Sequence, residues 1–154
     1  MEIEDLDDVV SIENASFSKP WSRNMFLREL ELKMSRNLVA KITKKSKTHI
    51  AGYITYWIVA DEIHLQKIAT GNDYRRSGIS SRLMKEMIRK SADNECNWCT
   101  LEVGALNESA INLYKKFGFN VQGVRPLYYA ERDEDALIMG ADLKKCMMMI
   151  QHEP

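Results

Sequence analysis

The segment Arg75-Arg76-Ser77-Gly78-Ile79-Ser80 decides how this chain is interpreted, because it joins a strand-like run to a segment with helical periodicity. Residues 63–70 before it are apolar and typical of a strand, and after it the apolar residues recur at helical spacing, at Ile79, Leu83, Met84, Met87 and Ile88. A strand, a short turn with glycine and a helix N-terminus present backbone N–H groups and a positive dipole end to an anion. The segment therefore offers a candidate phosphate-binding turn, although by itself a turn with Gly and Ser is more often an ordinary connection.

A second segment, from Asn107 to Phe119, follows another strand-like run over residues 98–103. Asn107 is a typical helix N-cap. Tyr114 shares one helical face with Ala110, Ile111 and Phe117, so the pattern alone predicts a core position for its ring. An amphipathic aromatic residue can also pack its ring while its hydroxyl reaches a cleft.

These segments resemble the GNAT superfamily of acyl-CoA N-acyltransferases. Its pyrophosphate loop has the form Q/R-x-x-G-x-G/A, which Arg75, Gly78 and, imperfectly, Ser80 match, and residues 107–119 match its Asn-x-x-Ala-x-x-x-Tyr-x-x-x-Gly-Phe element. Within the superfamily the resemblance is closer to the RimI type, which acetylates the N-terminal alanine of a small-subunit ribosomal protein. The stretches that carry it are residues 17–22 with Phe26 and Glu29-Leu30, then Leu101-Glu102-Val103, then Tyr128-Tyr129 with residues 134–139.

The order of the patterns predicts a mixed α/β fold (α+β), with a GNAT-like central, mostly antiparallel twisted sheet flanked by helices. Helices are expected near residues 6–12, 25–32, 77–91 and from 107, and strands at 37–42, 49–59, 63–70, 98–103, 121–129 and 136–143. A polar hairpin turn is expected at 44–47. We expect an N-acetyltransferase domain over residues 1–143 and a C-terminal tail over 144–154. Only Met1-Glu2-Ile3 precedes the first helix, so the family's usual first strand should be short or partly missing.

The composition is that of a small enzyme. The 154 residues contain 22 Lys and Arg and 22 Asp and Glu, so the formal net charge is zero and no basic face for direct nucleic-acid binding is implied. No apolar run approaches the roughly 20 residues of a membrane span, and the N-terminus is acidic where a signal peptide would be basic. We therefore expect a cytoplasmic protein that does not bind membranes. The sequence leaves its oligomeric state open.

The chain has three cysteines, an odd number that argues against a disulfide framework. Cys96 and Cys99 have the C-x-x-C spacing of a redox or half-zinc site, but they lead into a strand and no second ligand pair follows. Buried thiols are the better interpretation, and no metal is expected.

The resemblance implies acetyl-CoA as co-substrate. The residues it implies for cofactor binding are Ile68, Ala69, Thr70, Arg75, Arg76, Ser77, Gly78, Ile79, Ser80, Ser81 and Asn107. Ser80 departs from the family pattern, which has Gly or Ala there. Its hydroxyl can either donate a hydrogen bond to the cofactor or obstruct its approach.

Acyl transfer to an amine needs a neutral nucleophile. At pH 7 deprotonation costs about 1.4 kcal/mol for an α-ammonium group and about 4.6 kcal/mol for a lysine, so an N-terminus is the easier acceptor. The resemblance assigns Glu102 as the general base, directly or through a water, and Tyr114 as the general acid for the departing thiolate. Without it, Glu102 would be an exposed strand-end carboxylate.

The resemblance also places an acceptor groove near Trp21, Tyr128, Tyr129, Glu134 and Asp135. Glu134 and Asp135 either attract an ammonium group or form ordinary turn and strand caps, and both interpretations stay open. The leading hypothesis is acetylation of the N-terminal alanine of a ribosomal protein. The expected partner is the flexible N-terminal peptide of that protein. The alternatives are a lysine or small-amine acetyltransferase and a non-catalytic acyl-CoA-binding module.

Overall fold

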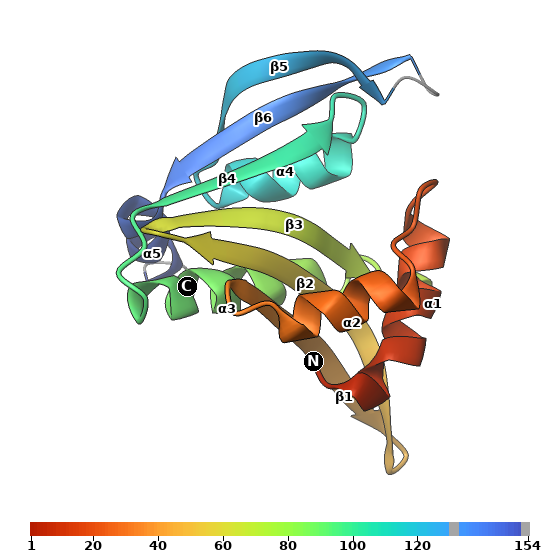
Figure 1. Cartoon of the computed structure of the whole chain (residues 1–154). Helices are drawn as coiled ribbons and strands as arrows, with labels where there is room; N and C mark the ends of the chain where they lie inside the picture. Colours follow the sequence, from red (N-terminus) through yellow and green to blue (C-terminus); the bar gives the residue numbers. More distant parts are fainter. Residues whose placement is uncertain (130–132, 152–154) are drawn as a thin grey trace. The chain divides into compact units, whose positions relative to one another are not determined.

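A computed structural model describes residues 1–129 and 133–151 of the chain (Figure 1). The chain divides into two compact units, which are described one at a time. Unit 1 contains Met1–Trp57 and Gln66–Glu86, and unit 2 contains Ile58–Leu65 and the described part of Met87–Pro154.

Unit 1 begins with a 3₁₀ turn, Ile3–Asp5, and no strand precedes the first helix in the part of the chain that the structure describes. The ammonium of Met1 donates to the carbonyl of Asn37 (3.0 Å). The elements that follow are α1 (Leu6–Ser16), α2 (Arg23–Glu31), β1 (Ser35–Lys44), β2 (Lys47–Val59), the C-terminal half of β3 (Glu62–Thr70) and the first half of α3 (Ile79–Ala92).

The β1–β2 hairpin confirms the turn that the sequence predicts at 44–47. Lys45 and Ser46 have φ of 47° and 63°, the left-handed conformations that match the twist of a tight hairpin. Ala40 pairs with Gly52 and Lys41 with Ile50, so Ala51 is an extra residue in β2. The Ala51 carbonyl accepts a hydrogen bond from Gly71 (2.9 Å), which fixes the chain just after β3.

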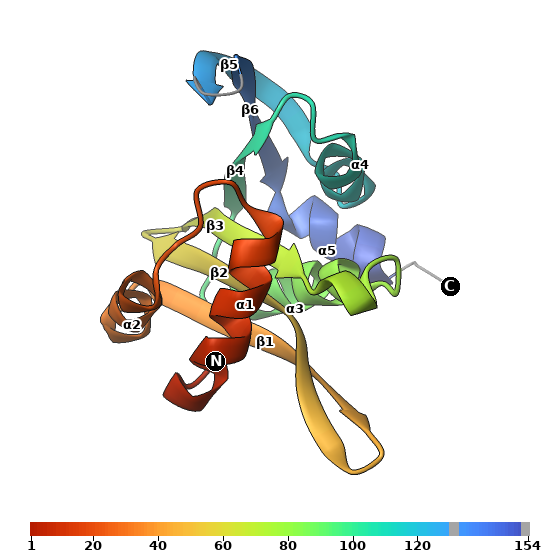
Figure 2. The same cartoon turned by 90° about the vertical axis from the view of Figure 1, so that its right-hand side faces the viewer.

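Helices α1 and α2 cover one face of this hairpin (Figure 2). Helix α1 buries residues three apart, the spacing of one helical face, and these join a core of Leu6, Val9, Ile12, Phe26, Ile50, Tyr53 and Ala69. At Gly52 a Cβ would lie 2.9 Å from Ile79 Cγ2 and 2.7 Å from the carbonyl of Ala69. The missing side chain therefore lets the start of α3 sit against β2.

Unit 2 contains the N-terminal half of β3 and the elements that follow α3. They are β4 (Trp98–Gly104), α4 (Glu108–Lys116), β5 (Asn120–Tyr129), β6 (Glu134–Asp142) and α5 (Leu143–Gln151). Alternate residues of strand β4 are buried, namely Cys99, Leu101 and Val103. Strands β4, β6 and β5 form a sheet, and α4 lies along it (Figure 1). The thiol of Cys146 on α5 donates to the Phe117 carbonyl (2.9 Å), so residues expected as a tail form a helix against the end of α4.

The hydrogen-bonded strand order is β1-β2-β3-β4-β6-β5. Strands β3 and β4 pair in parallel over Glu62–Leu65, whereas the β1–β2, β4–β6 and β5–β6 pairs are antiparallel. This confirms the mixed, mostly antiparallel sheet with flanking helices. None of the described helices is both long enough and apolar enough to cross a membrane.

Glu29 provides a test of how unit 1 is held together. Its buried carboxylate accepts from the Ser35 hydroxyl (2.6 Å) and from Trp57 Nε1 (2.8 Å), which links α2 to β1 and β2. Glu29→Ala leaves two donors without an acceptor, so the free energy of unfolding should fall by about 2–4 kcal/mol in urea titrations. The control Glu31→Ala changes an exposed residue of the same helix and should stay within about 0.5 kcal/mol of wild type. Equal effects of the two substitutions would contradict this account.

Candidate active site

The predicted phosphate-binding turn lies in unit 1, between the end of β3 and the start of α3. Arg76 and Gly78 have φ of 62° and 80°, and nothing lies within 4 Å of the position that a Cβ on Gly78 would take. The carbonyl of Gly78 accepts from Arg82 N–H (3.0 Å), so α3 begins directly after the glycine. The backbone at Gly78 is therefore open to close approach by a ligand.

Ser80 joins this turn to the end of β3. Its hydroxyl lies 2.7 Å from the hydroxyl of Thr70, and either group can be the donor. The side chain that departs from the family pattern thus has a partner within unit 1 and links the turn to the strand. Beside it, the Ser77 hydroxyl donates to the carbonyl of Tyr74, which closes the turn.

The side chains of the remaining candidate cofactor residues of unit 1 differ in their exposure to solvent. Ala69 and Ile79 are buried, so only their backbone groups are available to a ligand. Arg75 and Arg76 are exposed, and Ile68 and Ser81 are half-buried. Two arginines, an open glycine and the N-terminus of a helix of 14 residues are together suited to a polyanion such as a pyrophosphate.

Unit 2 carries the candidate base. Glu102 lies on the face of β4 opposite the buried residues, and its side chain is 29% exposed. Its Oε1 lies 3.2 Å from Arg125 Nη2 on β5. The carboxylate is therefore neither fully exposed nor buried, and a guanidinium holds it in place.

The candidate acid, Tyr114, is 5% exposed on α4 and packs against Phe119, with ring centroids 5.9 Å apart. Burial, with smaller contributions from Cys99 and Tyr129, raises the pKa of its phenol above the usual value. The phenol is therefore protonated at neutral pH, and it is a weaker acid than an exposed tyrosine. The core position that the helical pattern predicts is confirmed.

Asn107 caps α4 as predicted, because its side-chain oxygen accepts from the N–H of Ala110 (3.2 Å). The cap uses Oδ1, and the Nδ2 amide of this exposed residue is the group that can donate to a ligand.

The acceptor candidates of unit 2 lie on β5 and β6. Tyr128 is 50% exposed and packs edge-to-face on Tyr129, at 5.1 Å between ring centroids. Glu134 is 6% exposed and accepts from Leu106 N–H (3.0 Å), and Asp135 accepts from Leu127 N–H (2.8 Å). Glu134 thus binds the turn after β4, and Asp135 binds the backbone of β5.

Trp21, the acceptor candidate of unit 1, lies in the turn between α1 and α2. Its ring packs against that of Phe26, with ring centroids 5.5 Å apart. The backbone N–H of Trp21 donates to Glu13 Oε1 (2.8 Å). Sequence reasoning missed Glu13, Lys67 and Arg125, which contact candidate residues. An acidic residue on the apolar face of a helix, as Glu13 is in α1, was the available signal for the first of them.

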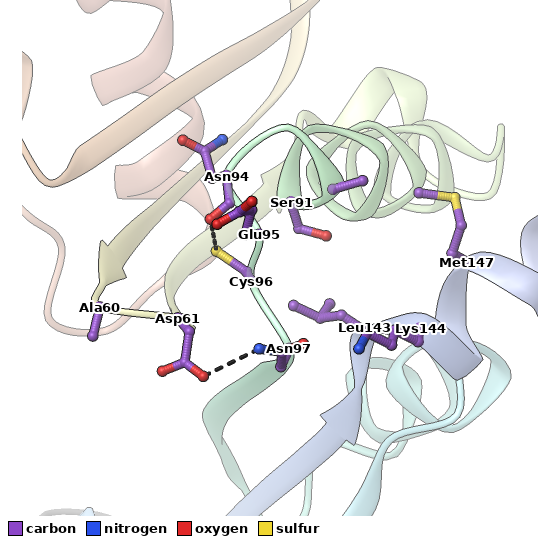
Figure 3. Close-up of a pocket in the computed structure, with 11 residues that line it drawn as sticks. Ala60, Asp61, Ser91, Asn94, Glu95, Cys96, Asn97, Leu143, Lys144 and Met147 are labelled. Carbon is purple, nitrogen blue, oxygen red and sulfur yellow. Dashed lines mark hydrogen bonds between the residues drawn. The ribbon is translucent and has the colours of Figure 1, made fainter.

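A hollow of about 870 Å³ in unit 2 is lined by none of the predicted site residues. It lies at the end of α3, the turn before β4 and the start of α5 (Figure 3). Asn97 Nδ2 donates to Asp61 (3.2 Å) and the Cys96 thiol to the Asn94 carbonyl (3.7 Å) at its edge. Its walls mix charged, amide and apolar side chains, without a concentration of one chemistry.

Cys96, Cys99 and Cys146 are thiols and not disulfides, and all three are buried. Burial raises the pKa of Cys99 well above its usual value and that of Cys146 to about 11, so both are protonated at neutral pH. Within residues 1–129 and 133–151, no three His, Cys, Asp or Glu side chains form a group that could hold a metal ion.

The chain belongs to the acetyltransferase (GNAT) family, whose model matches residues 6–119. The protein is thus an N-acetyltransferase that takes its acetyl group from acetyl-CoA. It is 33% identical over 141 residues to the [ribosomal protein bS18]-alanine N-acetyltransferase of Escherichia coli K12, covering 90% of this chain and 92% of the relative. The crystal structure of the ribosomal-protein-S18-alanine N-acetyltransferase from Escherichia coli matches 93% of this chain and 90% of its own, with a TM-score of 0.81 and 31% identity.

A further solved structure, Ard1 from Thermoplasma volcanium, is similar in fold. Its TM-score is 0.82 at 23% identity, and the match covers 92% of this chain and 93% of that one. The agreement between fold and family confirms the resemblance that the two sequence segments indicate.

The turn between β3 and α3 gives the first functional test. Replacing both Arg75 and Arg76 by alanine removes two exposed cations, so we expect KM for acetyl-CoA to rise about tenfold or more with kcat little changed. Both constants are measured by steady-state kinetics at varied concentrations of acetyl-CoA. Arg89→Ala, an exposed residue in the last turn of the same helix, is the control. An unchanged KM in the double variant would remove these arginines from the cofactor site.

Proposed function

We propose that this enzyme acetylates the N-terminal α-amine of a protein that begins with alanine, a small-subunit ribosomal protein, in the cytoplasm. The observation that carries the proposal is the similarity to the Escherichia coli K12 protein, because it extends over 90% of this chain and that protein is named for this acceptor. The lower cost of deprotonating an α-ammonium group supports the same acceptor class.

For the acetyl donor, the proposed site in unit 1 is the backbone of Ile68, Ala69 and Thr70 with the turn from Arg75 to Ser81. The arginines and the N–H groups at the start of α3 would hold the pyrophosphate, and the end of β3 would lie along the acetyl and pantetheine arm. Ser80 would act mainly through its hydrogen bond to Thr70, which fixes the turn to the strand. In unit 2, Asn107 Nδ2 would donate to the same arm.

For the reaction, we assign Glu102 as general base and Tyr114 as general acid. The amine nitrogen forms a bond to the thioester carbonyl carbon while Glu102 takes one of its protons, directly or through a water. The carbon–sulfur bond then breaks, and the thiolate takes a proton from Tyr114. Exchange with solvent returns both groups to their starting states. The assignment of both residues rests on the family motifs that they match. Because burial raises the pKa of the Tyr114 phenol, transfer of its proton to the thiolate requires the sulfur to lie directly against the hydroxyl.

For the acceptor peptide, we propose contacts to Trp21 and to Tyr128 and Tyr129, whose rings are partly exposed. Glu134 would act by fixing the turn after β4 through Leu106, because its carboxylate is buried. Asp135, at the surface, would fix the β5 backbone at Leu127.

The acceptor is tested with short peptides. Peptides that begin with the N-terminal sequence of bS18 should gain one acetyl group by mass spectrometry when the α-amine is free. The same peptides with a blocked N-terminus and an internal lysine should gain none. Gain on the blocked peptide would move the activity to lysine. No gain on any peptide, with measurable acetyl-CoA binding, would favour a small amine or a binding module.

The base is tested by Glu102→Gln, which preserves shape and removes proton-accepting ability. We expect kcat on the alanine peptide to fall by about 10²- to 10⁴-fold while acetyl-CoA binding is retained. Glu95→Gln, at an exposed carboxylate before β4, should leave both unchanged. A Glu102→Gln enzyme with normal kcat would exclude the assignment.

A further inference from the structure

Glu13 on α1 is a fully buried carboxylate outside the proposed machinery. Its side chain has no exposed surface, and it accepts hydrogen bonds from three directions. Trp21 N–H (2.8 Å) and Lys67 Nζ (2.7 Å) bind Oε1, and the Tyr53 hydroxyl binds Oε2. One of these donors belongs to the turn between α1 and α2, and the other two belong to β2 and β3.

Lys67 also contacts aromatic rings at the two ends of the same turn. Its side chain is 14% exposed, and its Nζ lies 3.9 Å from the centroid of the Phe17 ring and 5.3 Å from that of Trp21. An ammonium over aromatic faces at these distances is attracted to both rings. The single cation thus contacts both ends of the segment from Phe17 to Trp21.

An aromatic chain completes the arrangement. The Trp21 ring packs on Phe26 and the Phe26 ring on Tyr53, each pair edge-on with centroids 5.5 Å apart. Because the Tyr53 hydroxyl donates to Glu13, the chain leads back to the carboxylate that holds the Trp21 backbone. Glu13 therefore holds the backbone of Trp21 directly and its ring through Tyr53 and Phe26.

Stability alone does not require a charged pair here, since apolar residues of similar volume often replace buried ion pairs without loss. What an ion pair adds at this point is a defined position for the turn. Lys67 also directly precedes Ile68, the start of the proposed donor strand segment.

We propose that the Glu13–Lys67 pair is a positioning device that sets the α1–α2 turn, and with it Trp21, for binding the N-terminal residues of the acceptor peptide. This inference rests on the proposed function for its substrate. It makes Lys67 and Glu13 residues that determine acceptor affinity without touching the reacting atoms.

The test compares Lys67→Met and Lys67→Arg with wild type on the alanine peptide. Lys67→Met keeps the length of the side chain and removes the cation, so KM for the peptide should rise about five- to thirtyfold while KM for acetyl-CoA stays unchanged. Lys67→Arg keeps a cation that stacks on aromatic rings, so its KM for the peptide should lie close to that of wild type. Lys47→Met, at an exposed lysine of β2, is the control and should behave as wild type.

A double variant separates positioning from stability. Glu13→Gln with Lys67→Met replaces the ion pair by a neutral pair, so its unfolding free energy should recover relative to Lys67→Met alone. The peptide KM should nevertheless stay raised, because the cation is still missing. Recovery of KM together with stability, or an equal rise in both KM values in Lys67→Met, would overturn the proposal.

Exchange of the Trp21 amide proton, measured by NMR, gives a readout that does not depend on turnover. It should be faster in Lys67→Met than in wild type, and unchanged protection would also overturn the inference. If wild type acetylates no alanine peptide, the proposed function fails, whereas the exchange measurement still decides whether the pair holds the turn.

Discussion

A carboxylate without exposed surface must be met by hydrogen bonds from the protein, and at Glu13 this requirement organises unit 1. The donors come from the turn after α1, from β2 and from β3, so satisfying one side chain places three separate segments of the chain. One of these donors, Tyr53, also belongs to the apolar core of unit 1, and the Glu13 side chain has no contact with water. Removing water strengthens each of these hydrogen bonds and makes any other arrangement of the segments costly.

The turn between β3 and α3 and the candidate residues of unit 2 are held in place in different ways. The turn is built from local geometry: a glycine at φ 80°, a hydroxyl pair and the start of a helix. In unit 2 the candidate carboxylates have partners distant in sequence: Glu102 pairs with Arg125, and Glu134 accepts from the backbone N–H of Leu106. The turn proposed to hold the pyrophosphate is thus a property of a short segment, whereas the positions of the carboxylates in unit 2 depend on how the strands are paired.

This difference explains what the sequence could predict. Helical spacing after Ile79, the N-cap at Asn107 and the polar turn at Lys45 are local signals, and each corresponds to the observed element. The pairing of Lys67 with Glu13 joins residues 54 positions apart, and no spacing rule reports it. Likewise, an acidic pair such as Glu134 and Asp135 looks the same in sequence whether it faces a ligand or a backbone amide, and only the fold separates the two cases.

Strand β5 ends the strand order and leaves Val121, Val124 and Leu127 exposed. An apolar strand in that position could recruit a strand from another molecule. Here Pro126 lacks an N–H to offer, Leu127 turns into the left-handed region at φ 52°, and the register with β6 is irregular between Arg125 and Tyr129. The same irregular backbone that presents Tyr128 thus breaks the regular edge that a strand of another molecule would need for pairing beyond Arg125.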